Sequence, residues 1–269
     1  MHSATATRRT LSGAPQGADL WLATRVEHAA LNATAVREQM LYDGWLVRWS
    51  PGETKRTRSI NVVAPPVTPF ESRFDFCRRW YARQGLPMTF RIASHGPDHS
   101  LDGQLESRGL QYHGATCVMA LDLPCDAGAD APTLAFEQTD CATFSRAVGT
   151  LRGLGTEAAR EHQRRLETLA VDVLPLVARQ PDGRWAAAGL VVLDDDIGGL
   201  FDIVVAPSLR RQGLGRATVT RLLMAAQERG ARTAYLQVEQ DNEPARRLYG
   251  AYGFRDIYTY WYRSAAQSA

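Results

Sequence analysis

Lysine is almost absent from this sequence. Lys55 is the only one, although the 269 residues carry 31 basic and 29 acidic side chains in all. We attribute this preference for arginine to genomic base composition. The formal net charge of +2 argues against a dedicated nucleic-acid binder, which usually has a strongly basic face. Long hydrophobic runs are also missing, and none approaches the roughly 20 apolar residues of a membrane helix. We therefore expect neither a nucleic acid nor a membrane as a partner.

Disulfide and metal-binding patterns are missing too. The four cysteines show no C-x-x-C spacing, which is typical of reduced thiols in a cytoplasmic protein. His95, His99 and His113 lack the spacing of metal ligands, and His162 lies among charged residues of a predicted helix. We therefore expect no metal site.

The apolar content of 45% is enough for one large core or two ordinary ones. Segment 124–132 is rich in small residues, glycine and proline, and it predicts a linker between two domains, 19–123 and 133–269. Residues 1–18 carry two arginines and no acidic residue. That composition also fits a transit peptide, but no apolar face develops, so we favour a disordered segment.

The second half predicts a mixed α/β domain. Hydrophobic periodicity and turn residues predict helices at 140–151, 157–169, 214–228 and 244–251, and strands at 174–179, 185–193, 200–205, 233–238 and 254–262. Gly230 is the expected end of the third helix, and Pro244 stands in the first turn of the fourth, where proline is tolerated.

Three blocks of the first half repeat the end of the second half in the same order. "INVVAPP" from Ile60 is similar to "DIVVAPS" from Asp202, and "YARQGLPMTFRI" is similar to "AQERGARTAYLQV". "LDGQLESRGLQYHG" from Leu101 is similar to "ARRLYGAYGFRDIY" from Ala245. Matched blocks in one order predict two domains of one fold.

The glycine turn after strand 200–205 is the most informative stretch of the chain. "LRRQGLGRA" places Gly213 and Gly215 at the start of a predicted helix, among Arg210, Arg211 and Arg216. A helix N-terminus presents unpaired N–H groups and partial positive charge, and glycine lets a ligand approach the backbone, which suits a pyrophosphate. The first copy has "PVTPFESRF" here, with two prolines and no glycine, so it lacks these donors.

Two other phosphate-binding loops fit poorly. No Gly-Lys-Ser/Thr follows Gly215, which excludes the nucleotide-triphosphate loop. A dinucleotide fingerprint needs glycine directly after the strand and a third glycine where Thr218 stands, although Glu239 could imitate its ribose-binding acid. Dinucleotide-dependent redox chemistry is therefore a weaker alternative.

"RRQGLG", residues 210–215, matches the Gln/Arg-x-x-Gly-x-Gly/Ala signature of the GNAT superfamily of acyl-CoA-dependent N-acyltransferases. "NEPARRLYGAYGF", residues 242–254, resembles the second characteristic block of that family. The resemblance covers the chain from about residue 133 to the end, and the first half resembles a degenerate member. It implies an α/β fold of two tandem GNAT-like domains, each a mixed, mostly antiparallel central sheet flanked by helices.

The same resemblance implies a site for acetyl-CoA as co-substrate. Backbone amides from Gln212 to Arg216 would hold the pyrophosphate, and Val205 would pair with the pantetheine arm like an added strand. Asn242 would steady the pantetheine end, and Tyr249 would protonate the leaving thiolate as a general acid. Asp202 is a candidate base or amine-orienting group. The expected coenzyme-binding residues are Val204, Val205, Arg210, Arg211, Gln212, Gly213, Leu214, Gly215, Arg216, Asn242 and Ala245.

We expect an enzyme that transfers an acetyl group to the primary amine of a small molecule or peptide, by direct attack in a ternary complex. The alternative is a non-catalytic acyl-CoA sensor, against which Tyr249 and Asp202 argue. The sequence leaves open the acceptor, the acyl chain length, the general base and whether the protein is a monomer or a homodimer.

The stretch from Trp45 to Arg58 is the first candidate for a wall of the acceptor site, because ligand sites favour domain interfaces. Tryptophans give contact area, and arginines clamp acidic groups. The competing interpretation makes Lys55, Arg56 and Arg58 a solvated strand edge and treats the tryptophans as packing residues. We also expect the second domain alone to retain acetyl-CoA binding without selective turnover.

Overall fold

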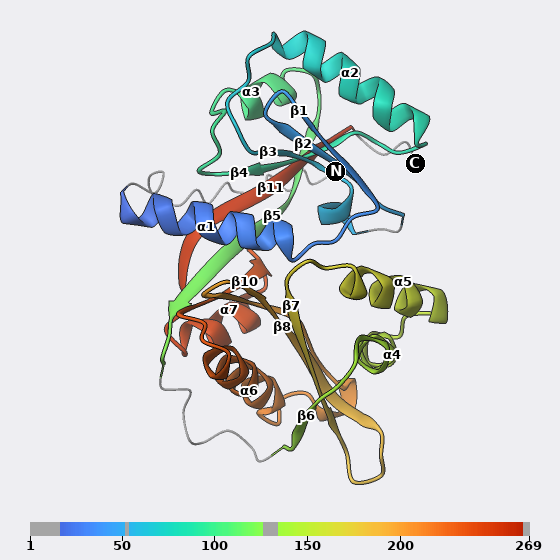
Figure 1. Ribbon diagram of the computed structural model, residues 1–269, viewed down its shortest axis with the longest axis vertical. Helices are drawn as coiled ribbons and strands as arrows, with labels where there is room; N and C mark the ends of the chain where they lie inside the picture. The colour runs from blue at the N-terminus through green and yellow to red at the C-terminus, as the bar shows by residue number, and fades with distance from the viewer. Residues whose placement is uncertain (1–16, 52–53, 126–133, 266–269) are drawn as a thin grey trace, which may run out of the picture.

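The computed structural model describes residues 17–51, 54–125 and 134–265. All strands in these ranges join one sheet of eleven strands, in the order β1-β2-β3-β4-β11-β5-β10-β9-β8-β7-β6 (Figure 1). The first half of the chain forms the upper part of the molecule in Figure 1, and the second half forms the lower part. Most of the expected disordered segment 1–18 and most of the expected linker 124–132 lie outside the described residues, so both stay predictions. None of the described helices is long and apolar enough to cross a membrane.

The first half begins with a helix and an antiparallel pair of strands, after which helices and strands alternate. Its elements are α1 (Ala18–Asn32), β1 (Glu38–Tyr42), β2 (Trp45–Trp49), the 3-10 helix η1 (Lys55–Thr57), β3 (Ile60–Val62), α2 (Phe70–Arg83), β4 (Thr89–Ala93), α3 (Leu101–Glu106) and β5 (Gln111–Asp122). Helix α1 packs across the middle of the molecule against the cluster that contains Ile197, Tyr258 and Tyr260, so it covers parts of both halves (Figure 1).

The second half contains every helix and strand that its sequence predicts. Its elements are β6 (Phe136–Gln138), α4 (Cys141–Arg152), α5 (Thr156–Glu167), β7 (Asp172–Arg179), β8 (Trp185–Asp194), β9 (Ile197–Val205), the 3-10 helix η2 (Pro207–Leu209), α6 (Leu214–Glu228), β10 (Thr233–Glu239), α7 (Glu243–Gly250) and β11 (Arg255–Ser264). Local caps explain several boundaries. The Asp140 carboxylate accepts the Thr143 N–H at the start of α4, and Gly153 ends that helix with a left-handed φ of 69°.

The helices of the second half lie on two faces of the sheet. Alternate residues of β8 point to opposite sides, so Leu190 and Val192 pack with α4 while Val191 and Leu193 pack with α6. Helix α6 lies close to β8, because a Cβ on Gly189 would come within 2.7 Å of the Leu222 side chain. The α4–α5 face and the α6 face are therefore separate surfaces.

The last strand of each half lies beside strands of the other half. Strand β5 pairs antiparallel with β10 and with β11, and β11 pairs antiparallel with β4 and β5. In Figure 1 these two long strands run between the upper and lower parts of the molecule. A fragment containing only the second half would leave β11 with neither of its neighbours. The expectation that such a fragment binds acetyl-CoA on its own does not follow from this topology.

The three repeated blocks have equivalent local structures in the two halves. Strands β3 and β4 are parallel, as are β9 and β10. Gly109 and Gly253 both have positive φ, and they follow the short helices α3 and α7. At these two helix ends, the Leu110 N–H donates to the Leu105 carbonyl and the Phe254 N–H donates to the Tyr249 carbonyl. Leu105 thus occupies in the first half the place of Tyr249 in the second.

Candidate active site

Strands β9 and β10 separate at one end of their pairing. Their parallel register ends at Leu200 and Leu236, although both strands continue. Beyond this point Val204 and Val205 pair with β8 only, and both are half-buried. The edge of β9 that faces β10 is therefore left open for an extended ligand, because unpaired N–H and C=O groups on a strand edge accept an added strand.

The glycine turn follows directly and opens α6. Gly213 is the N-cap residue with a left-handed φ of 80°, and Arg211 before it also has a positive φ of 64°. Glycine adopts this conformation without strain. In the described chain, the backbone N–H groups of residues 211–216 have no hydrogen-bond acceptor. They form a set of unused donors at a helix N-terminus.

Three arginines surround these donors. Arg210, Arg211 and Arg216 are exposed, and no carboxylate of the described residues lies within 4 Å of their guanidinium groups. The Arg216 guanidinium lies over the Tyr252 ring, 5.5 Å from its centroid. The turn therefore combines free N–H groups with positive charge that no acidic residue of the described chain neutralises.

The second motif lies beside the first. A Cβ on Gly215 would lie 3.7 Å from Leu248 of α7, so the start of α6 is adjacent to that helix. Asn242 is the N-cap of α7, and its side-chain oxygen accepts the Ala245 N–H at 3.3 Å. The side chain of Asn242 thus has a structural role in addition to the role expected from the family.

Tyr249 on α7 is half-buried against Phe254, with ring centroids 6.0 Å apart. Its hydroxyl has no hydrogen-bond partner among the described residues. Burial raises the pKa of Tyr249 above its usual value. The side chain is therefore held as a neutral phenol whose proton is available to a ligand.

Asp202 lies on a β-bulge. The register of β8 against β9 shifts between Ala188 and Leu190, and Asp202 has a φ of 50°. Phe201 and Asp202 consequently both line one cavity on the α4–α5 face, although consecutive strand residues normally point to opposite faces. Tyr249 packs against the α6-facing cluster instead. The two expected catalytic residues therefore lie on opposite faces of the sheet.

The Asp202 carboxylate already has two strong partners. His162 Nε2 lies 2.9 Å from Oδ2, and Arg152 Nη1 lies 2.9 Å from Oδ1. Burial opposes the charged form, but the hydrogen bond from His162 and the nearby positive charges outweigh it and hold the pKa of Asp202 far below its usual value. A carboxylate with such a low pKa is a weak base, so the geometry favours orientation of an amine over proton removal.

A cavity of about 750 Å³ lies between the two halves at this point. Helices α4 and α5 and strand β9 line one side, and Thr34, Thr54, Arg56 and Thr57 of the first half line the other. The expected wall from Trp45 to Arg58 therefore contributes Pro51, Thr54, Arg56 and Thr57. Neither Trp45, which is fully buried in the core of the first half, nor Trp49 lines the cavity.

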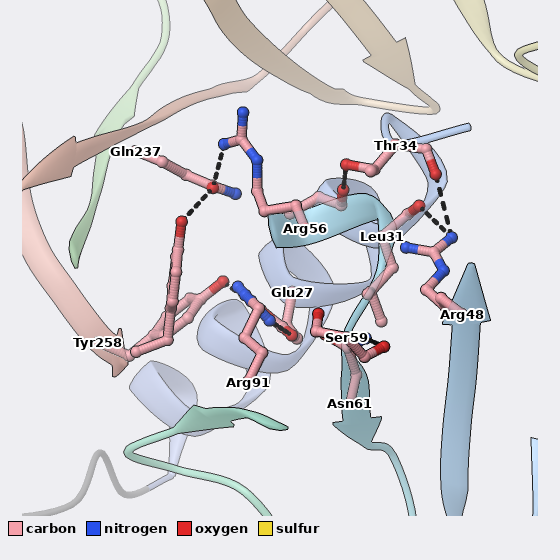
Figure 2. A network of polar contacts seen from close by, with 12 residues as sticks. Glu27, Leu31, Thr34, Arg48, Arg56, Ser59, Asn61, Arg91, Gln237 and Tyr258 are labelled. Atoms are coloured by element: carbon pink, nitrogen blue, oxygen red, sulfur yellow. Dashed lines mark hydrogen bonds and ion pairs between the residues drawn. The ribbon is translucent and has the colours of Figure 1, made fainter. Parts of the chain in front are cut away.

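Figure 2 shows how Arg56 reaches across the boundary between the halves. Its Nη1 donates to Gln237 Oε1 of β10 at 2.7 Å, and the guanidinium points away from the buried pair of Glu27 and Arg91. Gln237 directly follows Leu236, the last residue of β10 that pairs with β9. Arg56 thus comes from the first half to the place where the second-half strands separate.

Sequence reasoning missed the partners of Asp202 and a further arginine of this cavity, Arg165. His162 and Arg165 are three residues apart, a helical spacing that places them on one face of α5. That spacing was a usable signal. No sequence pattern indicates the ion pair between Arg152 and Asp202, because the two residues lie fifty positions apart and only the fold brings them together.

Comparison with known proteins decides the family. The family model described as "Probable histone acetyltransferase Rv0428c C-terminal" matches residues 23–263. The chain belongs to this acetyltransferase family. It is 26% identical over 245 residues to the uncharacterized N-acetyltransferase YobR of Bacillus subtilis, a match that covers 89% of this chain and 97% of that protein.

Two further relatives agree with that assignment. A stretch of 75 residues, 28% of this chain and 51% of the relative, is 37% identical to the ribosomal protein bS18-alanine N-acetyltransferase of Escherichia coli K12. The solved GCN5-related N-acetyltransferase from Kribbella flavida is similar in fold, with a TM-score of 0.69, 16% identity and coverage of 94% of this chain and 98% of that one. The predicted GNAT superfamily and fold class are confirmed, and the protein is an acetyltransferase enzyme.

Proposed function

We propose that this acetyltransferase moves an acetyl group from acetyl-CoA to the primary amine of an acceptor, by direct attack in a ternary complex. The observation that carries the proposal is the set of N–H groups at residues 211–216, which have no acceptor within the described residues and lie beside the open edge of β9. Three arginines without a carboxylate partner in that part of the chain surround them. A helix N-terminus of this kind binds phosphate groups well.

The described residues offer groups that suit the pyrophosphate and the pantetheine arm of the coenzyme. The amides from Gln212 to Arg216 would bind the pyrophosphate, and Arg210 and Arg211 would add charge. The open edge of β9 at Val204 and Val205 would pair with the amide groups of the pantetheine arm. The thioester would then lie where β9 and β10 separate, between Tyr249 on one face and Asp202 on the other.

The chemistry needs two proton movements. The neutral amine attacks the thioester carbonyl carbon, the C–S bond breaks, and Tyr249 donates its proton to the departing thiolate sulfur. The raised pKa of Tyr249 keeps that proton in place at neutral pH. Asp202 would attract and orient the amine, and water would take the proton that the amine loses.

The test is release of free CoA from acetyl-CoA in the presence of a library of amines, together with the affinity for acetyl-CoA measured by calorimetry. The proposal requires binding and amine-dependent CoA release. Binding of acetyl-CoA with no release for any amine would favour the sensor alternative, and absence of binding would contradict both.

A further inference from the structure

Two arginines of the cavity between the halves have no acidic partner. In the described chain, no carboxylate lies within 4 Å of Arg56 or Arg165, and the only acceptor for the Arg56 guanidinium is the Gln237 amide. The Arg165 guanidinium is half-buried and donates to no acceptor among the described residues. Both side chains belong to the lining of the cavity.

The other arginines of the lining are neutralised by neighbours. Arg152 pairs with Asp202 at 2.9 Å, and Arg164 pairs with Glu157 at 2.9 Å and with Glu161 at 3.2 Å. Among the described residues, the arginines of the lining that have no carboxylate within 4 Å are therefore Arg56 from the first half and Arg165 from α5.

These two charges act on each other. Burial lowers the pKa of Arg165, Glu161 and Asp202 raise it, and the positive charge of Arg56 lowers it again. Two like charges that face one cavity repel each other, and the Asp202 and Glu161 carboxylates that offset this repulsion already contact Arg152, His162 and Arg164. Ser145 also lines the cavity, and its buried hydroxyl has no hydrogen-bond partner in the described chain. The Ser145 hydroxyl is therefore a further polar group of the lining that can bond to a ligand.

On the basis of the acyl transfer proposed above, we propose that the acceptor is a small amine that also carries an anionic group, a carboxylate or a phosphate. Arg56 and Arg165 bind the anionic group, and the amine lies beside Asp202 where β9 and β10 separate. A volume of about 750 Å³ is within the usual range of small-molecule sites. A lysine-rich peptide would bring further positive charge against both arginines.

The test compares pairs of amines that differ in one anionic group: 4-aminobutanoate with 4-aminobutanamide, phenylalanine with phenylalaninamide, and O-phosphoethanolamine with ethanolamine. Spermidine and a lysine-rich peptide are tested in the same assay as amines that carry only positive charge. We expect kcat/KM for CoA release to be about 10- to 100-fold higher for the anionic member of at least one pair. A hydrogen bond to a charged group typically strengthens binding by about this factor. The pair that shows it distinguishes carboxylate from phosphate.

Three variants locate the preference. Arg56→Gln and Arg165→Gln should each lower the anionic preference about tenfold and leave the acetyl-CoA affinity unchanged, with folding checked by circular dichroism. Arg164→Gln is the matched control, because its charge is already paired with Glu157 and Glu161. It should keep the preference within about twofold.

A binding measurement separates this proposal from the proposed reaction. This measurement needs no turnover. The N-acetylated form of each compound in the three pairs is titrated into the CoA-loaded protein, including N-acetyl-O-phosphoethanolamine and N-acetylethanolamine. Tighter binding of an anionic member, lost in Arg56→Gln and Arg165→Gln, supports the anionic site even if no CoA is released. CoA release with equal or better use of neutral or cationic amines would overturn the anionic site and leave acyl transfer intact. Equal binding within every pair would also overturn it.

Discussion

The turn between β3 and α2 and the turn between β9 and α6 occupy equivalent places in the two halves, but they differ in what their N–H groups bind. In the first turn, the Val67 and Thr68 N–H groups donate to the Asp43 carboxylate at 2.9 and 2.8 Å. In the second, the N–H groups of residues 211–216 have no acceptor within the described chain. The first turn thus has an anion from its own chain, and the second is open to a ligand.

The charged side chains near the two turns differ in the same way as the N–H groups: those of the first turn are paired, and those of the second are not paired within the described residues. Arg73 lies 3.5 Å from the Asp43 carboxylate and stacks on the Trp45 ring, so the charges of the first turn neutralise each other. The arginines of the second turn remain exposed and unpaired in the described chain. Leu105, fully buried, stands where the second half has Tyr249. The two equivalent turns therefore differ: the first is closed and has Leu105 at the equivalent position, and the second is open and has the Tyr249 phenol.

The largest effect is expected from removing the Tyr249 hydroxyl, which the equivalent residue of the first half, Leu105, also lacks. Tyr249→Phe removes the proton donor and keeps the ring against Phe254, so kcat should fall by about 10²–10⁴-fold with little change in acetyl-CoA affinity. Rapid-quench measurement of the acetyl-transfer step checks this. Tyr42→Phe, in the first half, is the control. A loss below about threefold would assign the proton transfer to another group.

The second prediction gives the open turn a carboxylate of its own, as the closed turn has. Gly213→Glu places a negative charge where the pyrophosphate binds, and acetyl-CoA affinity should fall by at least about 100-fold through clash and repulsion. Gly213→Asn is the matched control, because asparagine tolerates the left-handed conformation and adds no charge. A folded Gly213→Glu protein that binds acetyl-CoA as tightly as the unchanged protein would contradict this prediction, and the difference from Gly213→Asn measures the part due to charge.

The third prediction concerns the exposed arginines of the open turn. Arg210→Gln and Arg211→Gln should each weaken acetyl-CoA binding by about 3- to 10-fold at low ionic strength, and the loss should shrink as salt is added. Calorimetric titrations at two salt concentrations measure both. Arg229→Gln, at the far end of α6, should show neither effect. Losses that do not depend on salt would indicate that these arginines act through packing.

The smallest effect is expected from opening the closed turn. Hydrogen bonds from Thr68 lead the interactions that lower the pKa of Asp43. A group whose pKa is lower in the folded state contributes stability above its unfolded pKa of about 4 and loses it as pH falls through the folded value. Asp43→Asn should therefore lower the melting temperature slightly at pH 7, and the difference should vanish at acid pH. Asp75→Asn, an exposed partner of Arg78, is the control. A constant difference at all pH values would contradict the charged role of Asp43.

Local features of the second half were predictable because their causes lie within a few residues. The glycine pair, the arginines and Gly230 define α6 at both ends, and Pro244 fits the first turn of α7. The features that were missed depend on contacts between distant parts of the chain. The pairing of β5 and β11 with strands of the opposite half, the partners of Asp202 and the hydrogen bond from Thr68 to Asp43 arise only when the whole sheet has formed.

The most direct test of the difference between the two turns is the number of acetyl-CoA molecules bound by the full chain. A calorimetric titration should reach one equivalent per chain, which disappears in Gly213→Glu and persists in Asp43→Asn. Two specific equivalents per chain, or a single equivalent that survives Gly213→Glu and is lost in Asp43→Asn, would contradict the account.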